Sequence, residues 1–350
     1  MTDKIRVLVV DDSAFARKTI SKIIESDSEL QVVGTARDGQ DAFERVKSLK
    51  PDVVTLDVTM PNVDGLQALD LIMAEAPTPV VMLSAMTGEN TGTTIEALEK
   101  GAVDFFLKPS AMNPAGRSDE ESELITKVKI ASKISVSKLR ALGKVKSVRM
   151  SRPAGSGPKV SAVGKKILVI GSSTGGPKAL AALMPALPRD LPAAILVVQH
   201  MPPNFTKSLA ERLNAACSYS VKEASAGDKL EYGTALLAPG GYHMLVDKNG
   251  EIVLDEGPTV CGVRPAVNMT MESVARVYGK ISLGVILTGM GNDGTEGAGL
   301  IKKAGGRIAA EHESSCAVYG MPRSVAEAGC VDVVVPLRKM AIEIIKMCSD

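Results

Sequence analysis

Short apolar runs alternate with helix-length amphipathic segments along the first 108 residues. Such runs, bounded by polar turns, are typical of strands buried on both faces. They predict strands at Arg6–Val10, Gln31–Thr35, Asp52–Leu56, Val80–Ser84 and Asp104–Leu107, with helices at Ala14–Glu25, Gln40–Leu49, Gly65–Ala76 and Thr91–Lys100. Strands separated by helices of this length predict a parallel sheet with helices on both faces and right-handed crossovers. We expect a five-stranded, flavodoxin-like α/β domain.

The second half of the chain alternates in the same way but carries an insert. Strands are predicted at Ile167–Ile170, Ala194–Val198, Ser282–Thr288, Arg307–Glu311 and Asp332–Val335. Between Thr234 and Asp255, the runs ALLAP, HMLVD and EIVLD predict short antiparallel strands, with Asn249-Gly250 as a hairpin turn. This half is expected to be a doubly wound, Rossmann-like α/β domain with a small antiparallel β insert.

The segment between the two halves changes character at Gly143. Ser118–Leu142 has the period of an amphipathic helix, and its apolar face comprises Leu124, Val128, Ala131, Ile134 and Leu139. Lys144–Gly164 is rich in Ser, Pro, Gly, Lys and Arg, which is typical of a flexible linker. Its positive charge is either solvated or a docking surface for an acidic partner. We therefore expect domains at residues 1–125 and 165–350, joined by a helix and basic linker at 126–164.

Composition narrows the class of protein. A length of 350 residues favours two domains, and a net charge of +1 argues against nucleic acid as a partner. Five scattered cysteines without a C-x-x-C pair indicate reduced thiols in the cytosol. The N-terminus lacks the layout of a signal peptide, and no apolar run approaches membrane-spanning length. We expect a soluble cytoplasmic protein that is not inserted in a membrane.

Five polar residues follow predicted strands of the first half, where a parallel sheet presents its carboxyl edge. They are Asp11, Asp12, Asp57, Ser84 and Lys108. Three converging carboxylates repel one another unless a hard cation neutralises them, and oxygen ligands favour Mg²⁺. The hydroxyl and the lysine would bind the oxygens of a phosphoryl group, which a carboxylate can accept. The alternative is that the aspartates only cap a helix and end a strand.

These residues resemble the receiver domain of bacterial and archaeal response regulators. The matching stretches are VVDDS, TLDVTMPNVDG, VVMLSA and GAVDFFLKP. The resemblance implies that Asp57 is the phospho-acceptor, that Asp11 and Asp12 help it to hold Mg²⁺, and that a chemotaxis histidine kinase supplies the phosphoryl group. It further implies a phosphate-sensing hydroxyl at Ser84, a counter-ion at Lys108, a rotating aromatic residue at Phe105 and a cis bond at Lys108-Pro109.

The second half carries a candidate nucleophile in the turn Gly171–Gly175, which fits the pattern G-x-S-x-G around Ser173. His200 follows the next predicted strand, and Asp293 lies in the loop after Ser282–Thr288. All three could meet above one sheet edge, as serine–histidine–aspartate chemistry requires. The glycine-flanked Met290 loop would allow backbone N–H groups to bind an oxyanion. Alternatively, Ser173 and Asp293 cap helices and His200 is a packed histidine.

Other chemistries fit this turn less well. A dinucleotide fingerprint requires glycine at the position of Ser173 and an acidic residue near that of His200. A phosphate loop requires G-K-[ST], which is missing from the turn. The chain order Ser, His, Asp also differs from that of α/β-hydrolases, which disfavours that fold.

At these residues the second half is similar to chemotaxis protein-glutamate methylesterases of the CheB family. The matching stretches include IGSSTGGP, VVQHMPPNFTKSLAERL, APGGYHM, VRPAVN, LTGMGNDGTEGAGLIKKAGG and YGMPRSV. The resemblance implies hydrolysis of glutamyl methyl esters on chemoreceptors and deamidation of receptor glutamines. It also implies that Ser173, His200 and Asp293 are the catalytic residues, that the Met290 loop binds the oxyanion and that the esterase reaction needs no cofactor. A monomer is expected. Ser172 stands where the family often has alanine. His312 also departs from the family, and we expect His243 and His312 to be structural or site-wall residues.

Two complete sites joined by a linker suggest that an unphosphorylated receiver covers the esterase site and that phosphorylation of Asp57 releases it. Two alternatives remain at this stage. One is a phosphorylation-controlled binding module whose second half has lost activity. The other is an esterase that acts on a different methyl ester or on a small molecule.

Overall fold

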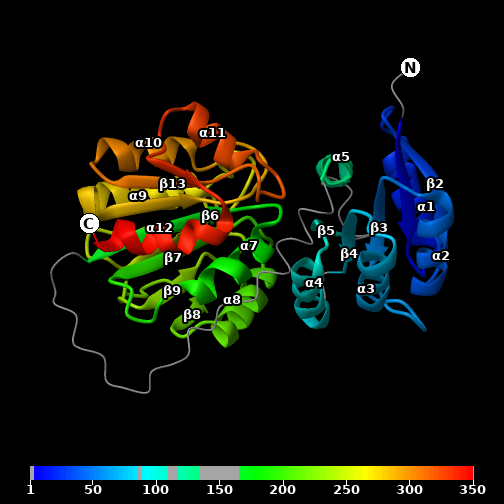
Figure 1. Ribbon diagram of the computed structural model, residues 1–350, viewed down its shortest axis with the longest axis horizontal. Helices are drawn as coiled ribbons and strands as arrows, with labels where there is room; N and C mark the ends of the chain where they lie inside the picture. Colours follow the sequence, from blue (N-terminus) through cyan, green and yellow to red (C-terminus); the bar gives the residue numbers. More distant parts are fainter. Residues whose placement is uncertain (1–3, 86–87, 109–116, 135–164, 350) are drawn as a thin grey trace. The chain divides into compact units, whose positions relative to one another are not determined.

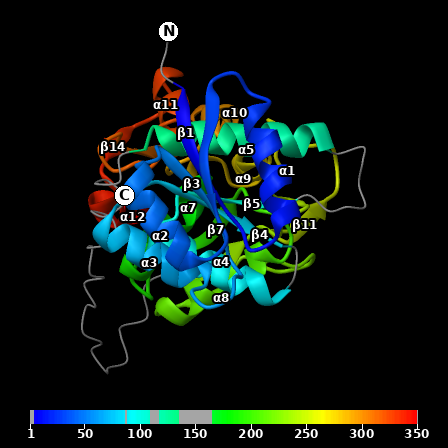
Figure 2. The ribbon, with the colours of Figure 1, turned by 90° about the vertical axis from the view of Figure 1, so that its right-hand side faces the viewer.

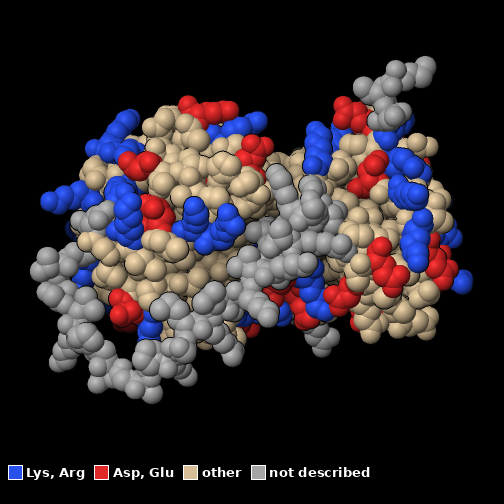
Figure 3. Space-filling model, viewed as in Figure 1, with Lys and Arg blue, Asp and Glu red and all other residues tan. Residues whose placement is uncertain are grey.

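The computed structural model describes residues 4–85, 88–108, 117–134 and 165–349, in two compact units at residues 1–143 and 144–350. Each unit has its own parallel sheet (Figure 1). Among the described residues, no helix is both long and apolar enough to cross a membrane. On the face drawn in Figure 3, acidic and basic side chains are interspersed over each unit, as expected from a net charge of +1.

The first unit has a five-stranded sheet in the order β2-β1-β3-β4-β5. All four neighbouring pairs are parallel, which confirms the predicted flavodoxin-like order. The strands are β1 (Ile5–Val10), β2 (Leu30–Ala36), β3 (Val53–Asp57), β4 (Val80–Ser84) and β5 (Asp104–Leu107), and the helices are α1 (Ala14–Glu25), α2 (Gly39–Leu49), α3 (Gly65–Glu75), α4 (Gly88–Lys100) and α5 (Arg117–Ser132). Figure 2 shows α1 and α5 on one face of this sheet and α2, α3 and α4 on the other.

Capping side chains explain where the helices of this unit begin. Ser13 accepts a hydrogen bond from the backbone N–H of Ala16 at the start of α1. Asp38 does the same at the start of α2, and Asp64 forms a capping box with Gln67 at the start of α3. Because each cap satisfies a backbone N–H that lacks a partner within the helix, the turn after each strand is fixed.

The last helix of the first unit is shorter than the predicted helix Ser118–Leu142. It ends at Ser132 and is followed by a turn at Lys133–Ile134. Leu124, Val128 and Ala131 are completely buried, and Lys129 forms ion pairs with Asp27 and Glu29. The expected domain boundary at residue 125 therefore falls inside a helix that belongs to the first unit. Leu139, Gly143 and the predicted linker Lys144–Gly164 lie outside the described residues.

The second unit has a seven-stranded parallel sheet in the order β14-β13-β12-β6-β7-β9-β8. The strands are β6 (Lys166–Ser172), β7 (Ala193–Gln199), β8 (Ser220–Glu223), β9 (Thr234–Leu237), β12 (Ser282–Ile286), β13 (Arg307–Glu311) and β14 (Val333–Val335). The helices are α7 (Gly176–Leu183), α8 (Phe205–Ala216), α9 (Val267–Tyr278), α10 (Thr295–Lys303), α11 (Met321–Glu327) and α12 (Leu337–Ser349), with 3₁₀ turns at Met184–Ala186 and Gly279–Ile281. Figure 1 shows α9, α10 and α11 on one face of the sheet and α7, α8 and α12 on the other.

The predicted antiparallel insert is only partly present. The run ALLAP forms β9, which joins the main sheet as a parallel strand between β7 and β8, and β8 itself was not predicted. The runs HMLVD and EIVLD form the antiparallel hairpin of β10 (His243–Val246) and β11 (Ile252–Asp255). Its turn contains Gly250 at a φ of 79°, a left-handed conformation that favours glycine.

The strand order places a topological switch point at the centre of the second sheet. From β6, the chain first builds β7, β8 and β9 on one side, then returns to add β12, β13 and β14 on the other. In open α/β sheets, ligands bind at the carboxyl ends of strands where the order reverses in this way. The carboxyl ends of β6, β7 and β12 carry Ser173, His200 and the loop with Asp293, respectively.

Candidate functional site

The turn that carries Ser173 is shaped by glycines at places with no room for a side chain. Gly175 has a φ of 78°, and a Cβ on Gly176 would lie 2.0 Å from Oε1 of Gln199. Pro177 then occupies the first turn of α7, where a missing N–H costs nothing. The chain therefore leaves the sheet abruptly at Ser173, whose side chain is half-buried.

Gln199, the last residue of β7, holds this turn to the neighbouring strand end. Its Oε1 accepts a hydrogen bond of 2.7 Å from the Ser172 hydroxyl, and its Nε2 donates to the carbonyl oxygens of Ser173 and His200 at 3.0 and 3.1 Å. The backbone N–H of His200 also donates to the Ser172 carbonyl at 3.1 Å. These bonds fix the backbones of the candidate nucleophile and the candidate base relative to one another.

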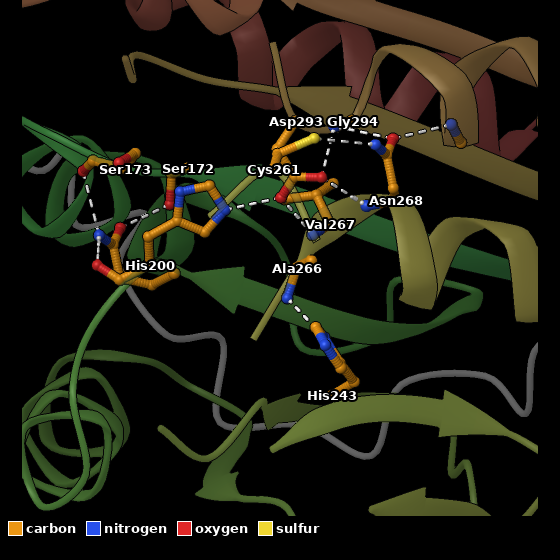
Figure 4. Close-up of polar contacts among 12 residues, drawn as sticks. Ser172, Ser173, His200, His243, Cys261, Ala266, Val267, Asn268, Asp293 and Gly294 are labelled. Atoms are coloured by element: carbon orange, nitrogen blue, oxygen red, sulfur yellow. Dashed lines mark hydrogen bonds and ion pairs between the residues drawn. The ribbon is translucent and has the colours of Figure 1, made fainter. Parts of the chain in front are cut away.

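His200 and Asp293 are in direct contact. Nε2 of His200 lies 2.7 Å from Oδ2 of Asp293, and both side chains are buried, at 8% and 2% exposure. Figure 4 shows the imidazole between Asp293 and the serines, with Nδ1 directed away from Asp293 and toward the turn of Ser172 and Ser173. A carboxylate at Nε2 favours the proton on that nitrogen, which leaves the Nδ1 lone pair available as a base.

The Ser173 hydroxyl forms no hydrogen bond with the His200 ring in this structure. In enzymes without bound substrate, catalytic hydrogen bonds are often long and tighten in the substrate complex. The structure thus brings His200 and Asp293 into contact, and places Ser173 on the adjoining strand end without closing the bond between serine and histidine.

Asp293 is held by backbone N–H groups at the start of two helices. Its Oδ2 accepts from Val267 at 2.6 Å, and its Oδ1 accepts from Asn268 and Gly294 at 2.9 Å each. Val267 and Asn268 begin α9, so the carboxylate satisfies N–H groups that lack a partner within the helix. Three hydrogen bonds of this kind fix the orientation of the carboxylate toward His200.

Asn268 caps the start of α10 with its side chain, as Asp293 caps the start of α9. Its side-chain Oδ1 accepts hydrogen bonds of 2.9 Å from the N–H groups of Gly294 and Gly297, at the start of α10. Asp293 was considered from the sequence either as a catalytic residue or as a helix cap. It caps α9, a helix distant in sequence, and it contacts His200 as well.

The loop after β12 lies against the Ser173 turn. The Ser173 N–H donates to the Thr288 carbonyl at 3.1 Å, and the Thr288 hydroxyl donates to the Thr174 carbonyl at 3.0 Å. A Cβ on Gly289 would lie 2.8 Å from that of Ser173, so this approach requires glycine. Met290 follows with 43% of its side chain exposed, and its N–H donates no hydrogen bond to another described residue.

The two remaining histidines are bonded elsewhere. His243 is completely buried, with Nδ1 accepting from the Ala266 N–H at 3.2 Å and Nε2 2.9 Å from the Pro258 carbonyl. This pattern requires a neutral ring with its proton on Nε2. His312 is exposed, and its ring contacts the Ser314 hydroxyl. Neither ring is bonded to Ser173 or Asp293.

The first unit gathers its predicted acidic residues at the carboxyl edge of its sheet. Asp11, Asp12 and Asp57 each offer an oxygen, and these oxygens lie within 4.8 Å of one another. Nζ of Lys108 bridges Asp11 and Asp57 at 2.7 and 2.8 Å. Burial raises the pKa of Asp57, although Lys108 favours its ionised form. Burial alone would lower the pKa of Lys108, but the two carboxylates together raise it.

Among the described residues, Lys108 pairs with Asp11 and Asp57 but forms no ion pair with Asp12. Within the same set, Arg17 donates only to the backbone carbonyls of Asp11 and Asp12. Three carboxylates beside these two cations leave an excess of negative charge on oxygen ligands. Such a donor set fits Mg²⁺, which prefers a few carboxylates and keeps several waters. Asp12 is exposed, whereas Asp57 is only 5% exposed, so the cluster opens to solvent on the side of Asp12.

The other predicted receiver residues lie near this cluster or behind it. Ser84 is completely buried at the end of β4, and its hydroxyl accepts a hydrogen bond from Thr94 at 3.0 Å. Phe105 is 4% exposed, and Nζ of Lys127 lies 5.2 Å from the centre of its ring. The expected cis bond at Lys108-Pro109 lies outside the described residues.

Four residues that support the second site were not singled out from the sequence. They are Gln199, Asn268, Thr288 and Glu311. Gln199 and Asn268 lie in the stretches VVQH and VRPAVN, but an amide has no reactivity that marks it as part of a site. Buried polar residues at predicted strand ends were the available signal.

Comparisons with known proteins agree with this architecture. The family model "CheB methylesterase" matches residues 168–344, and the model "Response regulator receiver domain" matches residues 7–114. A curated protein-glutamate methylesterase/protein-glutamine glutaminase from Symbiobacterium thermophilum is 50% identical over 99% of this chain and 98% of its own length. One from Thermotoga maritima is 46% identical over 99% of this chain and 100% of its own.

The solved catalytic domain of a Thermotoga maritima CheB methylesterase is similar to the second unit. It is 46% identical, with a TM-score of 0.51, and the match covers 53% of this chain and 100% of that one. With two relatives that match over nearly their whole lengths and a family model that spans half of the chain, this protein belongs to the CheB methylesterase family, with a response regulator receiver domain in front of the methylesterase domain.

Proposed function

We propose that this protein is a phosphorylation-regulated serine esterase that hydrolyses glutamate methyl esters on chemoreceptors and deamidates glutamines at equivalent sites. The observation that carries the proposal is the 2.7 Å contact between His200 and the buried Asp293, one strand end away from Ser173. The curated names of relatives at up to 50% identity support the same substrate class.

In the first half of the reaction, the Ser173 hydroxyl attacks the ester carbonyl while Nδ1 of His200 takes its proton. Nε2–H of His200 donates to Asp293, which stabilises the imidazolium that forms. Backbone N–H groups of the Met290 loop bind the oxyanion of the tetrahedral intermediate; one such donor typically contributes about 3 kcal/mol. As the tetrahedral intermediate collapses, the imidazolium protonates the leaving methoxide, methanol departs, and the glutamyl group remains as an ester on Ser173.

In the second half, water attacks that glutamyl ester and His200 again takes the proton. Collapse of the intermediate returns the proton to Ser173 and releases a glutamate carboxylate. With glutamine in place of the methyl ester, ammonia is the leaving group and the remaining steps are the same. The proposed route uses Ser173 as nucleophile, His200 as base and the Met290 loop as oxyanion donor, and it includes no step that calls for a cofactor.

The receiver would control this reaction through Asp57. Asp11, Asp12 and Asp57 would hold Mg²⁺, which neutralises the cluster when a phosphoryl group arrives. The ionised Asp57 carboxylate attacks phosphorus of the donor, which for a histidine kinase is a phosphohistidine. Lys108, which already pairs with Asp57, would pair with the new phosphoryl oxygens, and the Ser84 hydroxyl would bind one of them.

Methanol release from methylated chemoreceptor tests the esterase and its regulation together. We expect release by the wild-type protein to rise when Mg²⁺ and a small phosphodonor are added, and to be lost in Ser173→Ala. Asp57→Asn should keep the unstimulated release but no longer respond to the phosphodonor. Steady release by Ser173→Ala would place the nucleophile elsewhere, and no release by the wild type would favour a binding module.

A further inference from the structure

Glu311 is a completely buried carboxylate that the reaction scheme above does not use. It ends β13, one strand away from the strand that leads to the Met290 loop. Its Oε2 accepts a hydrogen bond of 2.9 Å from the backbone N–H of Thr288, and its Oε1 has no partner of normal hydrogen-bond geometry among the described residues. A buried carboxyl group is costly, so its position calls for a reason.

Thr288 connects this carboxylate to the Ser173 turn. Its N–H donates to Glu311, its carbonyl accepts from the Ser173 N–H, and its hydroxyl donates to the Thr174 carbonyl. The same hydroxyl accepts from the Val318 N–H at 2.9 Å, and Val318 in turn accepts from the Gly289 N–H at 3.1 Å. Thr288 thus touches both the nucleophile turn and the loop expected to bind the oxyanion.

Few other groups near Glu311 could donate a hydrogen bond to its carboxylate in place of Thr288. On the segment after β13, the Ser315 hydroxyl and the Cys316 thiol lie beside the carboxylate and slightly favour its ionised form. Burial outweighs them and raises the pKa of Glu311 to about 6. No charged side chain contributes to this shift among the described residues.

The charged groups of the elements packed on β13 are engaged elsewhere or exposed. Ion pairs join Lys302 to Asp332, Arg323 to Glu327, and Glu343 to Arg307 and Lys346. His312, the next residue in the chain, is exposed with its ring on Ser314, and Glu296, Lys303, Arg338 and Lys339 are exposed as well. Among the described residues, the Thr288 N–H is thus the group that joins the Glu311 carboxylate to the Ser173 turn.

We propose that Glu311 is a positioning residue of the esterase site, and that its ionised carboxylate holds Thr288 so that the Ser173 turn and the Met290 loop keep their reactive arrangement. This inference rests on the proposed function. An ionised acceptor binds an amide N–H about twice as strongly as a neutral one. Protonation of Glu311 weakens the bond that holds Thr288, and activity falls with it.

The test compares the pH dependence of kcat/KM for methanol release in wild type and Glu311→Gln. The neutral amide of glutamine cannot titrate and accepts from Thr288 only as weakly as the protonated carboxyl, so we expect a kcat/KM about ten-fold below that of the wild type at pH 7.5 and one fewer proton in the acid limb. For a group that titrates at about pH 6, the ratio of variant to wild-type kcat/KM should rise about five-fold between pH 7.5 and pH 5, because the wild type loses the stronger acceptor as Glu311 is protonated. Contributions from groups that both proteins share cancel in this ratio.

Glu327→Gln is the matched control, because Glu327 is an exposed carboxylate on α11. Its kcat/KM should follow the wild type at every pH. A ratio for Glu311→Gln that stays constant with pH would overturn the proposal while leaving the esterase assignment intact.

Amide hydrogen exchange gives a second readout that needs no activity. At pH 7.5 the N–H groups of Ser173 and Thr288 should exchange faster in Glu311→Gln than in the wild type, and Glu327→Gln should match the wild type. If the wild type released no methanol, the proposed function would fail, and this measurement would still decide whether Glu311 holds the turn. Equal exchange in all three proteins would reject the positioning role.

Discussion

Asp293 and Asn268 cap each other's helices. The Asp293 carboxylate accepts from the first N–H groups of α9, and the Asn268 side chain accepts from N–H groups at the start of α10. The residue in contact with His200 is therefore also the joint between two helices. Changes at either residue should affect stability and catalysis together.

Asp293→Asn should impair both properties strongly. The amide removes the charge that stabilises the His200 imidazolium and favours the wrong tautomer, so we expect kcat to fall about 10³- to 10⁴-fold. Loss of charge-assisted bonds to Val267 and Asn268 should lower the free energy of unfolding by about 1–3 kcal/mol. Methanol release and urea unfolding measure the two effects. The exposed Asp190→Asn is the control, and an equal loss there would argue against a specific role for Asp293.

Asn268→Ala should lower stability clearly and activity to a smaller extent. It leaves the N–H group of Gly297 without an acceptor and that of Gly294 with Asp293 alone, which for a helix cap lowers the free energy of unfolding by about 1–2 kcal/mol. Since Gly294 also donates to Asp293, we expect kcat to fall several-fold. Asn292→Ala, an exposed residue of the same loop, should show neither change in the same unfolding and kinetic assays.

Gln199→Met should show how much of the activity depends on the three hydrogen bonds of that side chain and how much on its volume. Methionine fills similar space but offers no hydrogen bonds to the Ser172 hydroxyl or to the carbonyls of Ser173 and His200. We expect kcat to fall at least ten-fold. Ser172→Ala removes only one of these bonds and should cost about 1 kcal/mol of stability and a few-fold in kcat. If the two variants lost activity equally, the bonds to the backbone would be unimportant.

The pH dependence of stability should report the burial of Glu311 directly. Its pKa rises from 4.5 to about 6 in the folded protein, so folding favours the protonated form. This contribution to stability is fully present below about pH 4.5 and is lost as the pH rises through 6. Between pH 4.5 and pH 7.5, the wild type should lose up to about 2 kcal/mol relative to Glu311→Gln. Urea unfolding of both proteins at several pH values measures the difference, and parallel curves would contradict it.

The sequence predicted most of the fold because its strands are short apolar runs that end in chemically distinct residues. Asp57 ends β3, and His200 follows β7, where the expected sheet edges lie. The pairing of ALLAP could not be predicted, since four apolar residues fit a parallel or an antiparallel neighbour equally well. Tertiary contacts decided that β9 lies beside β7.

The supporting residues of the site were beyond sequence reasoning for a different reason. Gln199, Asn268 and Thr288 act through hydrogen bonds to backbone groups far away in the chain. These backbone groups come close only once the sheet has formed, so the spacing of residues along the chain does not predict the hydrogen bonds. The helix end at Ser132 was missed because apolar residues continue with helical spacing beyond it.

The switch point at the centre of the second sheet has a consequence for how the protein is made. β6 is synthesised first but lies between β7 and β12, and β12 begins more than a hundred residues later, at Ser282. Until that strand emerges from the ribosome, one edge of β6 stays unpaired and Asp293 does not yet exist. A nascent chain thus holds Ser173 and His200 without Asp293, and under the proposed mechanism it becomes active only when the sheet is closed around β6.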